Sequence, residues 1–456
     1  MAQPYDNDRT QVQGRTSAEP YAQGNPYAAQ PGGAPYAGQP GANPYANQPG
    51  TRRAQGRQPV PSPPQQNPYI PQGVAPAPLR RHRRAGSGRA QSSQPPLERP
   101  RATGQVAPSA PVPAHAPRPR RHGRHGILSA LLWLVMAGVY GLLALRMIPA
   151  SHAAGSAVPE LVSFVPVALV PTIVCLALAL LWSRRVLAVA CALALAVNGW
   201  WHIGYFTGSA RVSSEATAAV ASTNTTADSY ARVMTCNTYN GQASAVDIVN
   251  LVREKHVEVL CLQELTDGMV DDLERAGIDE LLPYHVVSAG ASAISNGGRN
   301  GIWTAAPQDN VSRNLLPIDT SSMPAASIQV GDATVRIVSV HPNSPVRGAE
   351  DLWDEGLSVI GSLSDYGHAY LIMGDFNSAW DHARFRELLG TTFADAGQAS
   401  GGGMHMTYPA NKAIPALVEI DHIVYSKNSG IVVSSLETAQ VSGTDHLALI
   451  ATLEAL

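Results

Sequence analysis

The chain has 456 residues, enough for two or three ordinary domains, but its charge is so unevenly spread that the formal net charge of −2 describes no part of it. Before Ala231 there are 20 basic and 7 acidic residues, and from Ala231 onward there are 12 basic and 27 acidic residues. An acidic half without a cluster of Lys or Arg binds long nucleic acid poorly, because such binding rests largely on neutralising phosphates. The 4 cysteines have no metal-site spacing such as C-x-x-C, and the C-terminal half holds too few of them for a disulfide framework.

Residues 1–126 are rich in Pro, Gln, Gly, Ala, Tyr and Arg and contain the imperfect repeats GNPYAAQPG, GAPYAGQPG and GANPYANQPG. Such a composition buries too little apolar surface to offset chain entropy, so we predict a disordered arm. The arm ends in the basic run RPRRHGRHG. Two interpretations of this run stay open, namely attraction to anionic lipid head groups and a solvated tail that only fixes membrane topology.

Three apolar segments follow the arm: Ile127–Met147, Leu161–Trp182 and Val186–Phe206. Each is about twenty residues long and free of charge until its ends, which matches the thickness of a bilayer core. A cleaved signal peptide would not lie behind so long an arm and be followed by two further segments of this kind. We therefore predict three transmembrane helices within residues 127–207, with the lipid bilayer as a partner.

Positive charge predicts the orientation of these spans. Arg120, Arg121 and Arg124 precede the first span, and Arg184 and Arg185 lie in the turn between the second and the third. Both flanks face the cytoplasm under the positive-inside rule. The N-terminal arm is then cytoplasmic, and everything after the third span is extracellular.

A linker rich in Ser, Thr and Ala, residues 208–229, precedes a C-terminal part, residues 230–456, that is long enough for one sizeable core. The β-like runs in this part are RVMTCN, VEVLCLQ, YHVVSA, NGIWTA, SIQV, TVRIVSV, AYLIMGDF, EIDHIVYS, GIVVSSLE and HLALIATL. Amphipathic helical patterns lie near Ala245–His256 and Leu352–Ser364. Several strands are apolar throughout, as strands covered on both faces are. The pattern predicts a layered α/β domain with sheets packed together and helices outside.

Polar residues stand at the ends of many of these predicted strands. They are Asn237, Glu264, His341, Asp375, Asn377, Asp421, Asp445 and His446. We expect these side chains to converge on one rim of the sheets, and Asp375 and Asn377 at i and i+2 point the same way if the extended chain continues. Taken singly, each has an ordinary explanation as a turn residue or a hydrogen-bonded structural group.

In this order, the motifs TCN, LQE, VH, GDFN, IDHI and TDH resemble those of the endonuclease/exonuclease/phosphatase superfamily, the metal-dependent phosphoesterases that include DNase I-like nucleases, inositol phosphatases and sphingomyelinases. The resemblance covers about Arg232–Leu453. It implies a four-layer α/β sandwich, in which two packed mixed β-sheets are flanked by helices.

The resemblance also implies a divalent cation, Mg²⁺ or Mn²⁺. Glu264 would bind it, with Asn237 beside it and Asp445 at or near the metal. Hydrolysis of a phosphoester needs such a cation to neutralise developing charge, and carboxylate and amide oxygens are the ligands that hard cations prefer.

The remaining residues of the rim would carry out the reaction. By the same resemblance, Asp375 would orient and deprotonate the attacking water, and Asn377 would hold the phosphate. His446, oriented by Asp421, would contact the scissile phosphate, with His341 as a second group on the phosphate side. A carboxylate-held imidazole suits either proton donation or charge stabilisation.

The sequence departs from the family pattern chiefly in its basic residues. Glu419 stands where an Arg commonly precedes the IDHI-type motif, and Asn300–Trp303 stands where many relatives have a Gly-rich strand followed by Ser-Arg. Thr444 replaces the usual Ser, which is a mild change. The loss of basic groups counts against nucleic-acid substrates and leaves the hydrolytic residues intact. We interpret His422 as a structural residue that packs beside Asp421.

Three spans followed by an outer phosphoesterase domain are also similar to the actinobacterial membrane proteins associated with teicoplanin resistance. This similarity implies a phosphorylated lipid or cell-envelope intermediate near the outer leaflet. We expect a membrane-anchored, metal-dependent phosphoesterase acting on a lipid-linked or small phosphorylated substrate.

Two alternatives to this expectation stay open. One is a cell-surface nuclease acting on DNA or RNA, against which the scarcity of basic residues counts, since the candidates around the rim are chiefly Arg299, Arg313 and Arg347. The other is a non-catalytic receptor or scaffold that keeps the fold. The number of metal ions and the oligomeric state are not predicted.

Overall fold

The computed structural model describes residues 126–149, 157–289 and 299–456. The predicted disordered arm, residues 1–126, lies outside the described residues except for Gly126 at its end. The first described helices are α1 (Gly126–Leu145), α2 (Val158–Val162), α3 (Leu169–Leu181), α4 (Arg185–His202) and α5 (Gly204–Thr207), with the 3-10 turn η2 (Pro166–Ala168) before α3.

Within the described ranges, α1 and α4 are long and apolar enough to cross a membrane, and a shorter apolar helical stretch runs from Pro166 to Leu181. The prediction of one continuous helix over Leu161–Trp182 is wrong in its first part. Helix α2 ends at Val162, and Pro166, which has no N–H to donate, begins the turn that precedes α3.

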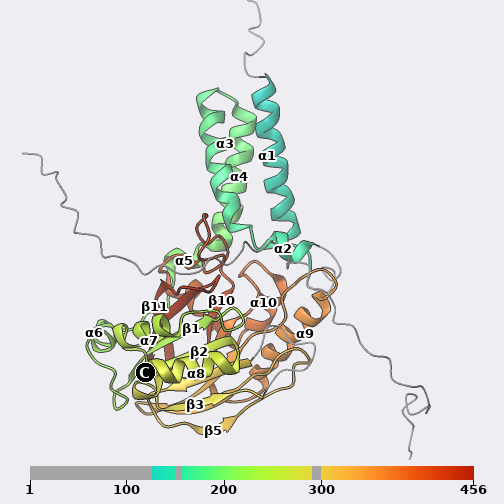
Figure 1. Cartoon of the computed structure of the whole chain (residues 1–456). Coiled ribbons are helices and arrows are strands. Elements are labelled where there is room, and N and C mark those ends of the chain that lie inside the picture. The colour runs from blue at the N-terminus through green and yellow to red at the C-terminus, as the bar shows by residue number, and fades with distance from the viewer. Residues whose placement is uncertain (1–125, 150–156, 290–298) are drawn as a thin grey trace, which may run out of the picture. The chain divides into compact units, whose positions relative to one another are not determined.

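Helices α1, α3 and α4 pack side by side (Figure 1) around small and branched apolar side chains. Large apolar side chains cover their outer faces and are more than half exposed, among them Ile127, Leu134, Val170, Leu181, Val186 and Leu193. These helices therefore present apolar surface outward, as protein in contact with lipid does.

The C-terminal part contains two six-stranded sheets. In spatial order, the first sheet comprises β11 (Ile431–Gln440), β12 (Leu447–Ala455), β1 (Tyr230–Asn237), β2 (Val259–Leu265), β4 (Arg299–Thr304) and β3 (Tyr284–Val287). The second comprises β5 (Asp309–Ser312), β6 (Ala325–Val330), β7 (Ala333–Val340), β8 (Ala369–Asp375), β10 (Asp421–Ser426) and β9 (Phe393–Asp395). Both sheets are mixed, because β1 pairs with β2 in parallel and β7 with β8 in parallel, while the other pairs are antiparallel.

Helices cover the outer faces of both sheets. On the first sheet lie α7 (Ala245–Glu254) and α8 (Asp267–Ala276), and on the second α9 (Glu350–Gly361) and α10 (Ala383–Leu389). A separate apolar cluster, which includes Val233, Ile337 and Met373, fills the space between the sheets. Figure 1 shows the two helix pairs on opposite sides of the sandwich. The predicted architecture of two packed mixed sheets flanked by helices is confirmed.

Shorter elements complete the structure. They are α6 (Ser214–Ser222), α11 (Ala396–Ser400), η3 (Ile278–Glu280) and η4 (Ser362–Asp365). Helix α6 lies within the segment expected to be a linker, where Ser213 caps it by accepting a hydrogen bond from the backbone N–H of Ala216. It packs against β1 and β12.

Strand pairing brings the polar strand ends together. Asn237 of β1 is in register with Gln263 of β2, Val340 of β7 with Gly374 of β8, and Asp375 with Asp421 of β10. Parallel neighbours carry their C-terminal ends to the same edge. Gly374 is required there, because its φ is 154° and a Cβ would lie 2.0 Å from the carbonyl oxygen of Val340.

Candidate active site

A cavity of about 410 Å³ opens at this edge of the sandwich. The predicted residues that line it are Glu264, His341, Asp375, Asn377, Asp445 and His446. Asn237 and Asp421 do not line the cavity but are fully buried and bonded to residues that do. A larger cavity, of about 680 Å³, contains none of the predicted site residues. The structure thus brings all the predicted site residues into one place.

Glu264 and Asp375 are held side by side by an amide between them. The Nδ2 of Asn237 donates to Glu264 Oε1 over 2.9 Å and to Asp375 Oδ2 over 3.0 Å. Glu264 has a φ of 56° and lies in a register shift between β2 and β4, so its side chain leaves the pleat and points into the cavity. The Asn237 side chain turns its amide nitrogen, and not its oxygen, toward the carboxylates.

The pKa of each of the two carboxylates lies above its ordinary value. Burial raises the pKa of Glu264, and the charge of Asp445 raises it further. Burial likewise raises the pKa of Asp375, although the charge of His446 opposes the effect. Asp375 also accepts a 2.7 Å hydrogen bond from the backbone N–H of Asn377, which fixes the direction of its carboxylate.

His446 forms a buried ion pair in the same cavity. Its Nδ1 lies 2.8 Å from Asp421 Oδ2, and its Nε2 lies 3.7 Å from Asp375 Oδ2. Burial alone would lower the pKa of His446, but the charges of Asp421 and Asp375 outweigh it and raise the pKa to about 10. The site therefore holds a fixed imidazolium that faces the carboxylate of Asp375.

His341 and Asn377 complete the polar lining. The Nε2 of His341 lies 3.5 Å from Asp375 Oδ2 and 3.7 Å from Glu264 Oε1. Burial lowers the pKa of His341, so this imidazole is neutral more readily than an exposed one. Asn377 has a φ of 49° and donates through Nδ2 to the carbonyl oxygen of Pro342 over 3.1 Å.

Two carboxylate oxygens in this region have no hydrogen-bond partner among the described residues: Oδ1 of Asp421 and Oδ1 of Asp445. Ligand atoms of Asp375, Asp421 and His446 also lie within 4.8 Å of one another, a group different from the predicted metal set. Within that group, Asp421 Oδ2 is already hydrogen-bonded to Nδ1 of His446, an ion pair that leaves only Oδ1 of Asp421 without a partner. The carboxylates on the Glu264 and Asp445 side are therefore the better place for a cation.

Residues outside the predicted set also build the site. Thr444 donates through Oγ1 to the carbonyl oxygen of Asn237 over 2.7 Å and accepts from the backbone N–H of His446, so it joins the ends of β1 and β12. The ring of Tyr408 lies 5.1 Å from that of His446. Glu160, Ser163 and Phe164, from the segment before α3, line the cavity as well. No motif in the sequence indicated these last four residues.

Two residues singled out in the sequence lie away from the cavity lining. His422 contacts Asp395 Oδ1 over 3.0 Å through Nδ1 and the carbonyl oxygen of Ser378 over 2.8 Å through Nε2. Burial would lower the pKa of His422, but Asp395 outweighs it and raises the pKa to about 9. Glu419 is also buried, and burial raises its pKa to about 7.

Residues 234–446 match the family described as Endonuclease/Exonuclease/phosphatase family. No curated protein sequence matches the chain. Among solved structures, D. rerio TDP2 humanized by 14 mutations is 14% identical and covers 50% of this chain and 100% of its own, with a TM-score of 0.41. Sphingomyelinase C from Streptomyces griseocarneus is 17% identical and covers 49% of this chain and 99% of its own, with a TM-score of 0.37.

The human Nocturnin catalytic domain with bound sulfate anion is 15% identical and covers 51% of this chain and 97% of its own, with a TM-score of 0.38. The family match spans the motifs from the end of β1 to the Asp-His pair before β12, which supply most of the residues that line the cavity. The match to the endonuclease/exonuclease/phosphatase family thus falls on residues 234–446, and it indicates an enzyme of the phosphoric ester hydrolase class.

Proposed function

We propose that the protein is a membrane-anchored, divalent-metal-dependent phosphoesterase that acts outside the cytoplasm on a lipid-linked or small phosphorylated substrate. The observation that carries the proposal is one cavity in which the carboxylates of Glu264 and Asp375 face the imidazolium of His446. A phosphoryl group in the cavity beside them meets both a base and a positive charge.

The residues present fit a hard divalent cation, Mg²⁺ or Mn²⁺. Glu264 and Asp445 supply carboxylate oxygens, and Oδ1 of Asp445 has no partner among the described residues. Asn237 would contribute its oxygen after its amide is turned over, since the oxygen now accepts from the backbone N–H of Tyr239. When bound, such a cation would neutralise charge on the phosphoryl oxygens.

The protein's own groups account for the movement of protons. Asp375 has a raised pKa, so its carboxylate is a suitable acceptor for a proton of the attacking water. The water oxygen forms a bond to phosphorus, and the bond from phosphorus to the leaving oxygen breaks. The leaving oxygen takes up a proton from solvent water, and Asp375 returns the proton it accepted to the solvent. His446, a cation held by Asp421, stabilises the phosphoryl charge, with His341 and Asn377 on the same side.

The exposed apolar faces of α1 and α4 support the membrane anchor, because they match the length of a bilayer core. Arg184 and Arg185 lie between α3 and α4, where α4 begins. The sandwich follows the other end of α4 in the chain. With these arginines in the cytoplasm, α4 leads the chain out, and the domain that follows is extracellular.

A surface nuclease is the second candidate, and the cavity counts against it. Among the described residues that line it there is no Lys or Arg. Arg299, one of the few basic residues expected near the rim, is paired with Asp267. A long polyanion would thus find little to neutralise its phosphates. A non-catalytic receptor remains the third alternative.

Hydrolysis by the full chain in detergent tests the proposal. Plasmid DNA, a phosphodiester chromogen and a polyprenyl pyrophosphate are each incubated with Mg²⁺ or with a chelator, and Asp375→Asn serves as the control. The proposal predicts Mg²⁺-dependent cleavage of the lipid or the chromogen while DNA stays intact. Nicked DNA without cleavage of the other substrates would contradict it and establish the nuclease.

A further inference from the structure

We infer that residues 159–164, here the α2 wall, form a specificity-determining wall of the active-site cavity, and that the substrate is a phosphorylated amphiphile whose apolar chain lies along this wall. The inference rests on the proposed phosphoesterase function. It adds the class of substrate and a residue, Phe164, that selects it.

The α2 wall comes from outside the family-matched residues 234–446. Glu160, Ser163 and Phe164 nevertheless line the same cavity as Glu264 and Asp375. The fold of the family supplies the reacting groups, and the chain's own helical region supplies one side of the space around them. A residue that faces the reacting groups from outside the shared fold is well placed to select between substrates.

The cavity lining combines charged and apolar side chains. Beside the carboxylates and His446 it contains an apolar set, which is Phe164, Pro345, Val346, Val418 and Ile420. Phe164 is 41% exposed and Val346 is 51% exposed, although both border an acidic site. A small hydrophilic phosphate would leave these apolar side chains in contact with water, whereas an alkyl or prenyl chain would cover them.

Buried contacts hold the α2 wall against the loop that follows Asp375. The Nε2 of His382 lies 2.6 Å from the carbonyl oxygen of Pro159, while its Nδ1 accepts from the backbone N–H of Ala379. Burial lowers the pKa of His382 to about 4, which keeps the ring neutral with one donor and one acceptor, as these contacts require. The wall is therefore fixed to the same loop that carries the reacting groups.

The α2 wall is continuous with the apolar surface of the helices. It lies between α1 and α3 along the chain, and Figure 1 shows α2 near the end of α1. Leu161 is 45% exposed, Phe164 41% and Val170, at the start of α3, 64%. An amphiphile in contact with the helices could thus move its head group into the cavity while its chain stays on apolar side chains.

Charge limits the head group to a few phosphates. The acidic residues in the lining are Glu160, Glu264, Asp375 and Asp445. They repel any phosphate beyond those that the cation and His446 neutralise, so a single terminal phosphoester or diphosphate fits and a polyphosphate chain does not.

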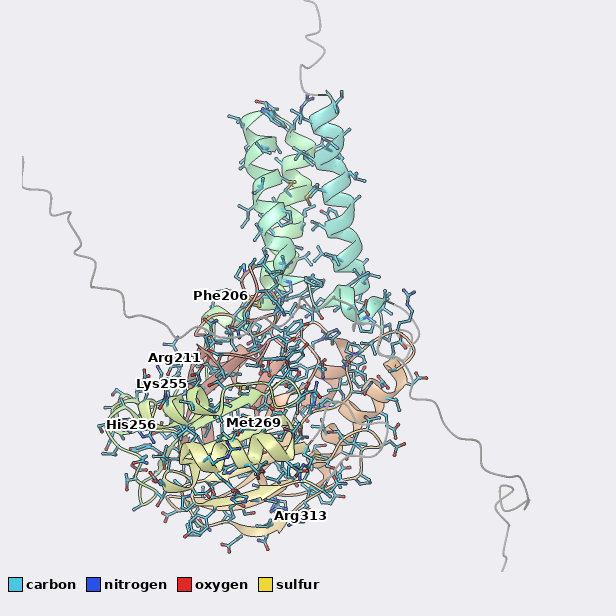
Figure 2. The ribbon with its side chains drawn as sticks, in the orientation of Figure 1. Phe206, Arg211, Lys255, His256, Met269 and Arg313 are labelled. Carbon is cyan, nitrogen blue, oxygen red and sulfur yellow. The ribbon has the colours of Figure 1, made fainter. Side chains whose placement is uncertain are left out.

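Two substrates with the same head group and different tails test the inference. The full chain in lipid nanodiscs with Mg²⁺ is given a long-chain and a short-chain prenyl diphosphate, and kcat/KM is measured for each. Phe164→Ala should lower the ratio of long-chain to short-chain kcat/KM about tenfold, and Phe164→Leu should restore most of it. Phe206→Ala is the matched control, because Phe206 is 61% exposed and lies outside the cavity lining (Figure 2).

A ratio within twofold of the wild type in Phe164→Ala would overturn the inference. Failure of the wild type to hydrolyse either compound or the phosphodiester chromogen would instead contradict the proposed function. In that case a binding measurement still tests whether the α2 wall contacts the apolar chain. The single variant Asp375→Asn should bind the long-chain diphosphate about tenfold more tightly than the double variant that also carries Phe164→Ala. Equal binding of the long-chain diphosphate by the two variants would show that the α2 wall does not select the substrate.

Discussion

His202 and Asp381 are joined by a 2.9 Å contact between Nε2 and Oδ2, and both side chains are buried. His202 ends α4, and Asp381 lies on the loop that follows the Asp375 strand. Arg146, just after α1, binds the other oxygen of Asp381. Burial alone would raise the pKa of Asp381, but its contacts with His202 and Arg146 outweigh burial and lower the pKa. One carboxylate thus ties two apolar helices to the active-site loop.

Asp381→Asn should therefore destabilise the full chain by about 3 kcal/mol, because Arg146 would lose its counter-charge in a buried position. Thermal unfolding in detergent measures the effect. Asp365→Asn, at an exposed position, is the matched control and should change little. Equal stability of the two variants would show that the Asp381 cluster does not join helices and domain in solution.

Asp421→Asn should change the pH dependence of turnover. Asp421 is the first of the charges that raise the pKa of His446 to about 10, so without it His446 loses its proton at a lower pH. The wild type should keep the imidazolium well above neutral pH, whereas the kcat of the variant should fall as pH rises through the alkaline range. A pH profile of kcat with the phosphodiester chromogen measures this, and superimposable profiles would argue against His446 as the cation.

Gly374→Ala should unfold the domain or destabilise it by about 3 kcal/mol, because the added Cβ would lie 2.0 Å from the carbonyl oxygen of Val340. Gly367→Ala is the control, since a Cβ there meets nothing within 4 Å. Urea unfolding of the two variants compares them. A stable Gly374→Ala protein would mean that β7 and β8 are not paired this closely.

Glu258→Gln should flatten the dependence of stability on pH. Burial and the charge of Asp228 raise the pKa of Glu258 from 4.5 to about 8 in the folded protein. The protonated carboxyl of Glu258 then contributes fully to stability below the pKa that it has in the unfolded chain. This contribution is lost as pH rises through about 8. Above that pH the free energy of unfolding of the variant should exceed that of the wild type by roughly 2 kcal/mol, which is less than the full pKa shift would give.

Urea unfolding at several pH values measures the effect, and Glu254→Gln, at an exposed position on the neighbouring helix, is the control. Parallel stability profiles for the wild type and Glu258→Gln would contradict the raised pKa.

Strands were the most predictable part of the fold. The runs that became β1, β2, β7 and β8 are largely apolar and end in or beside polar residues, and a strand buried on both faces leaves that pattern in the sequence. Short elements such as β9 (Phe393–Asp395) and α10 (Ala383–Leu389) were not predicted, because elements with so few residues are too short to show a hydrophobic periodicity. The break before Pro166 was missed, since hydropathy alone continues across it.

The polar side of the site was predictable for a related reason. Asp375, Asn377 and His446 stand at strand ends, so strand pairing alone brings them to one edge. Phe164 and Glu160 could not be found in this way, because their place in the cavity depends on how α2 contacts the loop that carries His382. Such contacts between distant segments are tertiary and leave no local signal.

Asp375 is the residue on which the proposed metal-dependent hydrolysis depends most, because it would serve as the base. The most direct test measures kcat for the phosphodiester chromogen by the full chain with Mg²⁺, in the wild type and in Asp375→Asn, together with the thermal unfolding of both. We expect activity that a chelator abolishes, a loss of at least about a hundredfold in the variant, and little change in stability. Hydrolysis at the wild-type rate by folded Asp375→Asn would contradict the account.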